Sequence, residues 1–258
     1  MAHPLLSLLH QMNVSLYQAA SALNANTRWQ EAIAENLASS SIPGFKKQEM
    51  AFSAIEAGLP SGAAGFGSRL TMPEANALTN FQAGEMKLTG VKTDVAIDGS
   101  GFFEVQLPSG ASAYTRDGEF RINAQGQLIT KGGHPVMSDT GTIQVDLNNP
   151  NPLSISASGE VSQGNDYKGK LKVVDFNDPR LLTTVGAGFF LANDPSVQAG
   201  EVKNPSLRQG YLEGANTSSA TEMSNLITSM RMFEANQRII QMQDERMGRA
   251  ISELGSPQ

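Results

Sequence analysis

The histidines of this 258-residue chain, which could carry out acid–base or metal chemistry, are few, and their spacing is unfavourable. The histidines are His3, His10 and His134. His3 and His10 are one heptad apart and could share a helix face, but two imidazoles are too few for a closed zinc site. His134 follows two glycines in an expected turn and has no identifiable partner in the sequence. The histidines therefore predict no metal site.

A glycine-rich loop and several carboxylates are the other candidates for chemistry. Asp98-Gly99-Ser100-Gly101 is glycine-rich like a phosphate loop, but it lacks the Gly-Lys-Ser/Thr ending and leads into an expected strand, not a helix. Asp94, Asp117 and Glu119 lie near expected turns, where acidic side chains shape hairpins. Residues 139–146 lack the ligand spacing of a calcium loop, and no Gly-x-Ser-x-Gly elbow occurs. We predict no catalytic residue, no cofactor and no enzyme activity.

The composition excludes further classes of protein. The chain has no cysteine, which removes disulfides, thiolate nucleophiles and iron–sulfur ligation. Its net charge of −6 argues against binding nucleic-acid phosphates, which takes a basic face. The longest apolar runs are too short for a transmembrane segment. The first residues lack a cationic start and a continuous apolar run, so we expect no cleaved signal peptide.

The first structural element that the sequence predicts is a long amphipathic helix at the N-terminus. Pro4 suits a first turn, and Ser39-Ser40-Ser41-Ile42-Pro43-Gly44 predicts the end, so the helix covers about 4 to 38. Most seam positions of its heptads are apolar, as in a coiled coil. One seam column holds Leu5, Met12, Ala19, Asn26 and Ile33, and the other holds Leu9, Leu16, Leu23, Gln30 and Leu37.

The last segment repeats this pattern up to Gly255. One column holds Met223, Met230, Gln237, Asp244 and Ile251, and the other holds Leu226, Phe233, Ile240, Met247 and Leu254. An amphipathic helix lying on a globular core would give a similar stripe. Because this stripe is narrow, long and present at both ends of the chain, we predict coiled-coil-like association of the helices. Polar seam residues such as Asn26 would set the register.

The middle of the chain, from 85 to 212, predicts a mainly antiparallel β domain of sandwich or barrel type. Short apolar runs there alternate with Gly, Asp and Asn turns, without the strand–helix alternation of a doubly wound fold. The glycine-rich segment 45–84 predicts an extended arm or a plain linker. The chain is therefore expected to be α+β, with one helical segment over 1–44 and another over 213–258.

Three motifs, in this order, resemble the bacterial flagellar rod and hook family of axial proteins over essentially the whole chain. The first includes Asn36-Leu37-Ala38 and Gly44-Phe45-Lys46, with Ser39 and Ser41 replacing the residues usual in the family. The second comprises 94–105, 114–120 and 126–128. The third is Gly210-Tyr211-Leu212-Glu213-Gly214-Ala215-Asn216-Thr217, followed by Glu222-Met223 and 231–236. The chain departs from the family pattern at 215–218.

The resemblance implies a structural subunit, with the terminal helices forming an inner coiled-coil-like domain and the β domain forming an outer layer. It implies assembly in the periplasmic rod of the flagellar basal body, with other rod proteins and copies of itself, after passage through the flagellar type III export apparatus. The short 46–84 segment and Arg231-Met232-Phe233-Glu234 favour the proximal rod type, with the distal type as the alternative. The expected assembly interface packs Leu9, Leu16, Leu23, Ile33 and Leu37 against Met223, Leu226, Met230, Phe233 and Ile240.

Two other classes of protein are compatible with the residues. One is an enzyme or carbohydrate-binding β domain that carries helical oligomerisation tails. The other is a coiled-coil adhesin or pilus-like subunit, for which a cleaved signal would be expected at the N-terminus. Deleting both helices separates the classes, because an enzyme would keep activity in its β domain.

Overall fold

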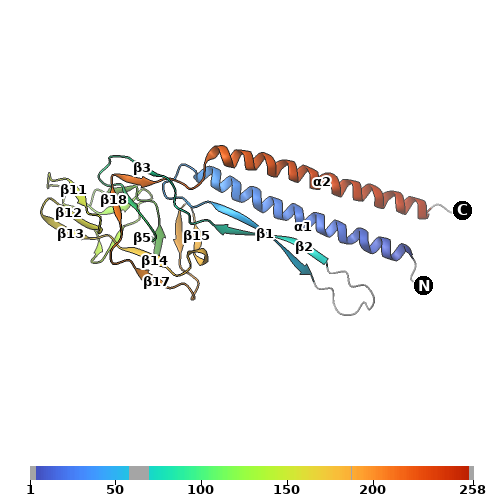
Figure 1. Cartoon of the computed structure of the whole chain (residues 1–258), viewed down its shortest axis with the longest axis horizontal. Helices are drawn as coiled ribbons and strands as arrows, with labels where there is room; N and C mark the ends of the chain where they lie inside the picture. Colours follow the sequence, from blue (N-terminus) through green and yellow to red (C-terminus); the bar gives the residue numbers. More distant parts are fainter. Residues whose placement is uncertain (1–3, 58–69, 187, 256–258) are drawn as a thin grey trace. The chain divides into compact units, whose positions relative to one another are not determined.

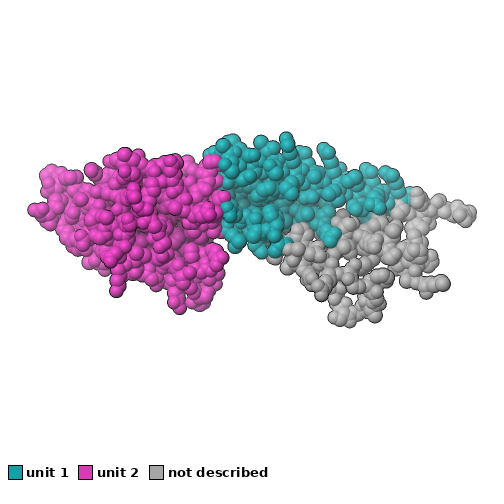
Figure 2. All heavy atoms as spheres, in the orientation of Figure 1, with its two compact units in different colours: residues 1–37, 48–78, 219–258 teal, residues 38–47, 79–218 magenta. Residues whose placement is uncertain are grey.

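The computed structural model describes residues 4–57, 70–186 and 188–255. These residues form two compact units (Figure 2). Unit 1 comprises residues 1–37, 48–78 and 219–258, and unit 2 comprises residues 38–47 and 79–218. The chain therefore passes from one unit to the other near residues 37, 47, 78 and 218, and unit 2 contains the middle of the sequence.

Two long helices dominate unit 1. Helix α1 (Pro4–Ser39) and helix α2 (Ser219–Gly255) confirm the two helices predicted from the heptads. They lie side by side and run in opposite directions (Figure 1), and the buried Asn26 of α1 bonds to Ser229 of α2. No helix among the described residues is long and apolar enough to span a membrane.

A two-stranded sheet completes unit 1. It pairs β1 (Gln48–Ala57) with β2 (Leu70–Thr79), so strands occupy part of the segment expected to be an arm or linker. An isolated pair of strands is marginally stable in water unless it packs on another element. Here Trp29 of α1 meets Phe52 of β1 edge to face, with ring centroids 6.0 Å apart. Residues 58–67, whose glycines motivated the arm prediction, lie outside the described residues.

Unit 2 is the central β region, and every strand pairing recorded in it is antiparallel. A six-stranded sheet has the order β15-β16-β6-β5-β14-β17, and a three-stranded sheet has the order β11-β12-β13. Shorter pairs are β18-β4, β19-β3, β7-β8 and β10-β9. The expected α+β class, with two long helices packed together and an antiparallel β region between them in the sequence, is therefore confirmed.

The strands of unit 2 are short, as the closely spaced turn residues predict. They are β3 (Met86–Leu88), β4 (Val95–Ile97), β5 (Phe102–Gln106), β6 (Ser112–Thr115), β7 (Phe120–Ile122), β8 (Leu128–Thr130), β9 (Met137–Ser138), β10 (Gly141–Thr142), β11 (Leu153–Ile155), β12 (Glu160–Gln163), β13 (Asp166–Lys170), β14 (Val173–Phe176), β15 (Thr183–Val185), β16 (Phe189–Leu191), β17 (Ala199–Glu201), β18 (Leu207–Gln209) and β19 (Tyr211–Glu213), with a 3₁₀ turn at Pro179–Leu181.

Two apolar clusters form the core of unit 2. The larger one gathers buried residues from many strands, among them Val95, Phe103, Phe120, Leu128 and Val161. The smaller one is mainly aromatic and consists of Phe102, Tyr114, Val174, Phe176, Leu182 and Phe190. Alternate residues of β5 supply both clusters, because successive side chains of a strand point to opposite faces. Strand β5 is therefore buried on both sides.

Candidate assembly surface and a buried junction

The residues considered for metal or phosphate binding make structural contacts within unit 2. The His134 ring packs edge to face on Phe189, at 5.2 Å between centroids. Asp98, in the glycine-rich loop, forms an ion pair with Arg208. No group of three or more His, Asp or Glu side chains that could hold a metal ion occurs in the part of the chain that the structure describes. His3 and the side chain of His10 lie outside that part.

The turn carboxylates also serve the hairpins. Asp94 accepts a hydrogen bond from the Thr89 hydroxyl at 2.6 Å, and Glu119 pairs with Arg121 and Lys131. Asp117 accepts the main-chain N–H of Glu119 at 2.9 Å, and burial raises the pKa of its carboxyl to about 6. Its hydrogen-bond partner is an amide of the same turn, so this shift reflects a desolvated hairpin residue, with no paired acid and base.

Within unit 1, the packed side of helix α2 is made of both polar and apolar residues. Ser229 and Glu222 are buried, at 0% and 3% exposure, and Leu226, Phe233 and Ile240 are half-buried. These positions recur at intervals of three, four or seven residues and so share one side of the helix. The Asn26–Ser229 bonds place α1 against this side. One column of the predicted seam, Leu226-Phe233-Ile240, is therefore on the packed face.

The other predicted column of α2 is exposed in the single chain. Met223 and Met230 are each 54% exposed, and Ile227, which shares their side of the helix, is 55% exposed. Glu222 and Ser229 are buried in their place, one residue earlier in the chain. We call Met223, Ile227 and Met230 the α2 stripe. Met232, Ile239 and Met242 are further exposed apolar residues of the same helix.

The predicted seam of α1 is more fully packed. Ile33 is buried, at 2% exposure, and Leu23 and Leu37 are half-buried. The side chains of Leu9 and Leu16 lie outside the described residues.

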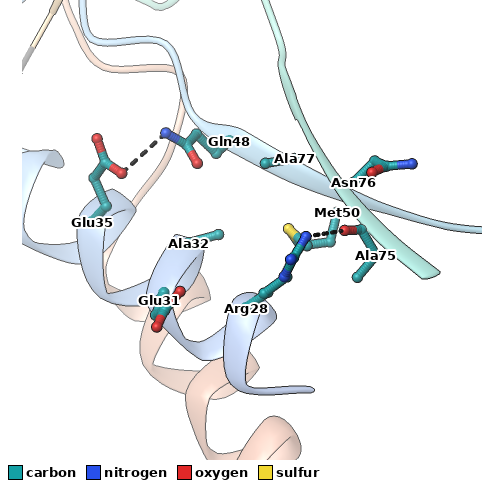
Figure 3. Close-up of a pocket in the computed structure, with 9 residues that line it drawn as sticks. All are labelled: Arg28, Glu31, Ala32, Glu35, Gln48, Met50, Ala75, Asn76 and Ala77. Atoms are coloured by element: carbon teal, nitrogen blue, oxygen red, sulfur yellow. Dashed lines mark hydrogen bonds between the residues drawn. The ribbon is translucent and has the colours of Figure 1, made fainter. Parts of the chain in front are cut away.

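A cavity of about 310 Å³ lies between α1 and the β1–β2 sheet. Figure 3 shows two hydrogen bonds at it: the Gln48 amide donates to Glu35 at 3.0 Å, and Arg28 donates to the carbonyl of Ala75 at 3.5 Å. The lining residues are Arg28, Glu31, Ala32, Glu35, Gln48, Met50, Ala75, Asn76 and Ala77. The polar groups at this cavity therefore hydrogen-bond strands β1 and β2 to helix α1.

Unit 2 contains a buried cluster of charges centred on Glu213. The Glu213 carboxylate, 2% exposed, accepts a hydrogen bond from the Lys46 ammonium at 2.5 Å and from Arg116 at 3.4 Å. It also accepts the main-chain N–H of Gly84 at 2.8 Å. Burial lowers the pKa values of both Lys46 and Arg116, and the neighbouring Glu213 opposes each shift. The cluster therefore depends on its own internal pairing for stability.

Arg116 has additional contacts that fix its orientation. Its Nη2 donates to the carbonyl of Gly99 at 2.8 Å, and its guanidinium lies over the Phe102 ring, 5.2 Å from the centroid. The Nε atom is buried without a hydrogen-bond partner in the described structure. The guanidinium therefore connects the Glu213 cluster to the aromatic core of unit 2.

Asn216 forms a second set of bonds close to Glu213 in the chain. Its side chain accepts the N–H of Lys47 at 2.7 Å and donates to the carbonyls of Asn80 and Gln82 at 2.7 and 3.1 Å. Its own N–H donates to the carbonyl of Phe45 at 3.2 Å. Segments 44–47, 80–85 and 213–216 are thereby bonded to one another, and we call them the junction.

The predicted motif residues contribute to this junction or stand near it in the sequence. Gly44 donates its N–H to the Glu213 carbonyl at 2.7 Å, and Phe45 is 1% exposed. In unit 1, the Asn36 side chain bonds both the carbonyl and the N–H of Gln48, at 2.9 and 2.8 Å. Leu212 is half-buried in β19, and Ala38 is exposed.

Lys46 and Arg116 belong to motifs in the sequence, but nothing in those motifs marks them as partners of Glu213. Asn80 and Gln82 were not singled out, because both contribute main-chain carbonyls and no side-chain pattern marks such a role. A lysine, an arginine and a glutamate in three separate motifs were the available signal. That signal does not say which of the many charged residues are buried.

Comparisons with known proteins agree with this arrangement. The model of the flagellar hook protein FlgE/F/G D1 domain matches residues 96–163, and that of the flagellar basal body rod FlgEFG protein C-terminal region matches residues 208–253. The flagellar basal-body rod protein FlgG of Borreliella burgdorferi is 31% identical over 260 residues, covering 91% of this chain and 96% of the relative.

Other relatives match at similar levels. FlgG of Buchnera aphidicola from Acyrthosiphon pisum is 33% identical, over 93% of this chain and 99% of its own. The flagellar basal-body rod protein FlgF of Escherichia coli is 30% identical, over 93% and 97%. The similarity extends over nearly the whole chain, and the two terminal helices stand before and after the β region in the sequence. The chain belongs to the flagellar basal-body rod FlgE/F/G family of structural, non-enzymatic proteins.

Proposed function

We propose that this protein is a structural subunit of the flagellar basal-body rod, and that it joins its neighbours through its terminal helices. The proposed partners are copies of itself and other rod proteins. The proposed location is the periplasmic rod, which the subunit reaches through the flagellar type III export apparatus without cleavage of a signal. Family membership supports the rod, and the chain's own surface supports the mode of joining.

The observation that carries the proposal is the exposed α2 stripe. Met223, Ile227 and Met230 lie beside the packed face of α2, and each is more than half exposed. Complete burial of a large apolar side chain contributes about 1.5–3 kcal/mol, so a neighbouring helix that covered the exposed part of this stripe would gain a share of that at each of the three residues. A contact between unlike surfaces of successive copies produces a helical filament when the rotation from copy to copy does not close a ring.

We further propose that the subunit is of the proximal rod type. The short 46–84 segment and Arg231-Met232-Phe233-Glu234 support this choice. The relatives are divided between FlgG and FlgF at about equal identity, so the distal type is the alternative. A peptide tag on this chain, imaged in isolated basal bodies, separates the two. A label at the inner end of the rod supports the proximal type, and a label next to the hook overturns it.

The assembly proposal is tested by Met230→Glu in the full-length chain. The substitution places a charge on the α2 stripe, where water solvates it in the free subunit and a neighbour would bury it. We expect the free chain to keep its wild-type unfolding free energy, and rods to lack the variant. Thr228→Glu, at an exposed position of the same helix that does not share a side with the α2 stripe, is the matched control and should be incorporated. Normal incorporation of Met230→Glu would contradict the proposed interface.

A further inference from the structure

The bonds of the junction join residues that are far apart in the sequence. Lys46 and Glu213 are separated by 167 positions, and Asn216 bonds to Asn80, which is 136 positions away. All three junction segments lie in unit 2, close in sequence to the points where the chain leaves that unit. The exits of the chain from unit 2 are therefore bonded to each other as well as to the β core.

We propose that the junction opens and closes as a single latch centred on Glu213, so that no one of its three segments is released without the others. This inference rests on contacts inside unit 2 and is independent of the proposed function. It assigns a conformational role to Lys46, Arg116 and Glu213, beyond their place in motifs.

The first argument is electrostatic. The side chains of Lys46 and Glu213 are 1% and 2% exposed, and Arg116 is 8% exposed. Removing one partner of a buried ion pair leaves an uncompensated charge in a poorly solvated place, which is strongly destabilising. Lifting segment 44–47 away would leave the buried Glu213 with Arg116 alone, at 3.4 Å, and lifting segment 213–216 would leave both cations without their carboxylate. Each separate opening is therefore more costly than a joint one that hydrates all three groups.

The second argument is the shared hydrogen bonds. Lys46 donates to both Glu213 and the carbonyl of Gln82, and Asn216 bonds to segment 44–47 and to segment 80–85 at once. Gly84 adds its N–H to the same Glu213 oxygen that Lys46 contacts. Polar networks of this kind are stabilised as a whole and weakened as a whole, and proteins open locally in such contiguous units.

Amide hydrogen exchange of the full-length chain tests the latch. One reporter amide per segment is available: Gly44, Asn80 and Asn216 each donate to a main-chain carbonyl in another junction segment. Leu128 and Val136, which donate to main-chain carbonyls within the β core, report on unit 2 as a whole. In Glu213→Gln, which keeps the shape and removes the charge, the three reporters should exchange at least tenfold faster, by a common factor, with the core amides unchanged.

Two further variants keep the test decisive. Asn216→Ala perturbs the junction without burying a charge, and it should accelerate the same three reporters together even if Glu213→Gln fails to fold. Asp178→Asn makes the same carboxylate-to-amide change in the exposed Asp178–Arg180 pair and should leave all three at the wild-type rate. Acceleration confined to the mutated segment would show that the segments open independently and would overturn the latch. Acceleration of Leu128 and Val136 by the same factor in Asn216→Ala would also overturn it, because the junction would then open only with the core.

Discussion

Asn26 and Ser229 hydrogen-bond to each other across the two helices of unit 1, although 203 positions separate them in the chain. The Asn26 side chain donates to the Ser229 carbonyl at 2.9 Å and accepts the Ser229 hydroxyl at 3.3 Å. Both residues are buried. A polar pair at a helix seam favours the one register in which both partners are satisfied.

Asn26→Ala should lower the unfolding free energy of unit 1 by about 1–3 kcal/mol, because it removes one partner of a buried hydrogen bond. Ser229→Ala should cost less, since the carbonyl acceptor remains. A double-mutant cycle measured by urea unfolding should give a double variant less destabilised than the sum of the two singles. Asn24→Ala, at an exposed position of α1, serves as control. Strict additivity would contradict a direct coupling of Asn26 and Ser229.

Phe233→Asp should separate the two helices even in the isolated chain. Phe233 is half-buried on the packed face of α2, and replacing it removes an apolar contact and places a carboxylate there. We expect a loss of about 1.5–3 kcal/mol in unit 1, seen as reduced helical circular dichroism, with the amide exchange of Leu128 unchanged. Gln237→Asp, at an exposed position, is the control. Unchanged helicity would show that Phe233 is not needed for pairing.

Gly44→Ala should destabilise unit 2 more than an ordinary glycine substitution. Gly44 has a φ of 66°, and an added Cβ would collide with the main-chain carbonyl of Arg116. Gly110 is a matched control, because its φ is 83° and nothing lies within 4 Å of an added Cβ. Gly110→Ala should cost about 1–2 kcal/mol from the left-handed backbone alone, and Gly44→Ala should exceed it by at least about 1 kcal/mol. Equal losses in urea unfolding would refute a close approach at Gly44.

Asp117 should make unit 2 less stable as the pH rises. Burial raises its folded pKa to about 6, from an ordinary value of 3.8. Between those values the folded chain keeps a proton that the unfolded chain has released, so the unfolding free energy falls as pH increases from about 4 to 6. The full penalty at pH 7 is about 3 kcal/mol.

The check is Asp117→Asn, which removes the titration and keeps the oxygen that accepts the Glu119 N–H. Urea unfolding should show the variant more stable than wild type at pH 7, with the difference shrinking as pH falls towards 4. Asp94, Glu119 and Lys131 also act on Asp117, and they are the same in both proteins. A difference independent of pH would mean that Asp117 titrates normally.

The helices were predictable because a seven-residue apolar repeat persists over their whole length. The packed face of α2 was only half predictable. Met223 and Met230 occupy heptad positions suited to a seam, yet Glu222 and Ser229 are buried in their place. A serine that bonds to Asn26 has no apolar signature, so its position follows from a partner on the other helix. The apolar repeat of a single chain also does not distinguish packing within a subunit from packing between subunits.

The junction was less accessible from the sequence. The motifs containing Lys46, Arg116 and Glu213 were recognised, but charged residues are usually exposed, and burial of these three depends on strands far apart in the chain. Turns in the β region were easier, since Gly, Asp and Asn mark them locally. Short-range signals therefore predicted the elements, and long-range pairing decided which polar groups are enclosed.

The separation of bonded partners along the chain has a consequence for folding on the ribosome. Lys46 bonds to a residue 167 positions further on, and Asn26 to one 203 positions further on. Neither partnership can form until most of the polypeptide has been synthesised, and contacts of such high sequence separation slow folding. The nascent chain therefore lacks both its helix pair and its junction during most of translation, and these structures can form only near its completion.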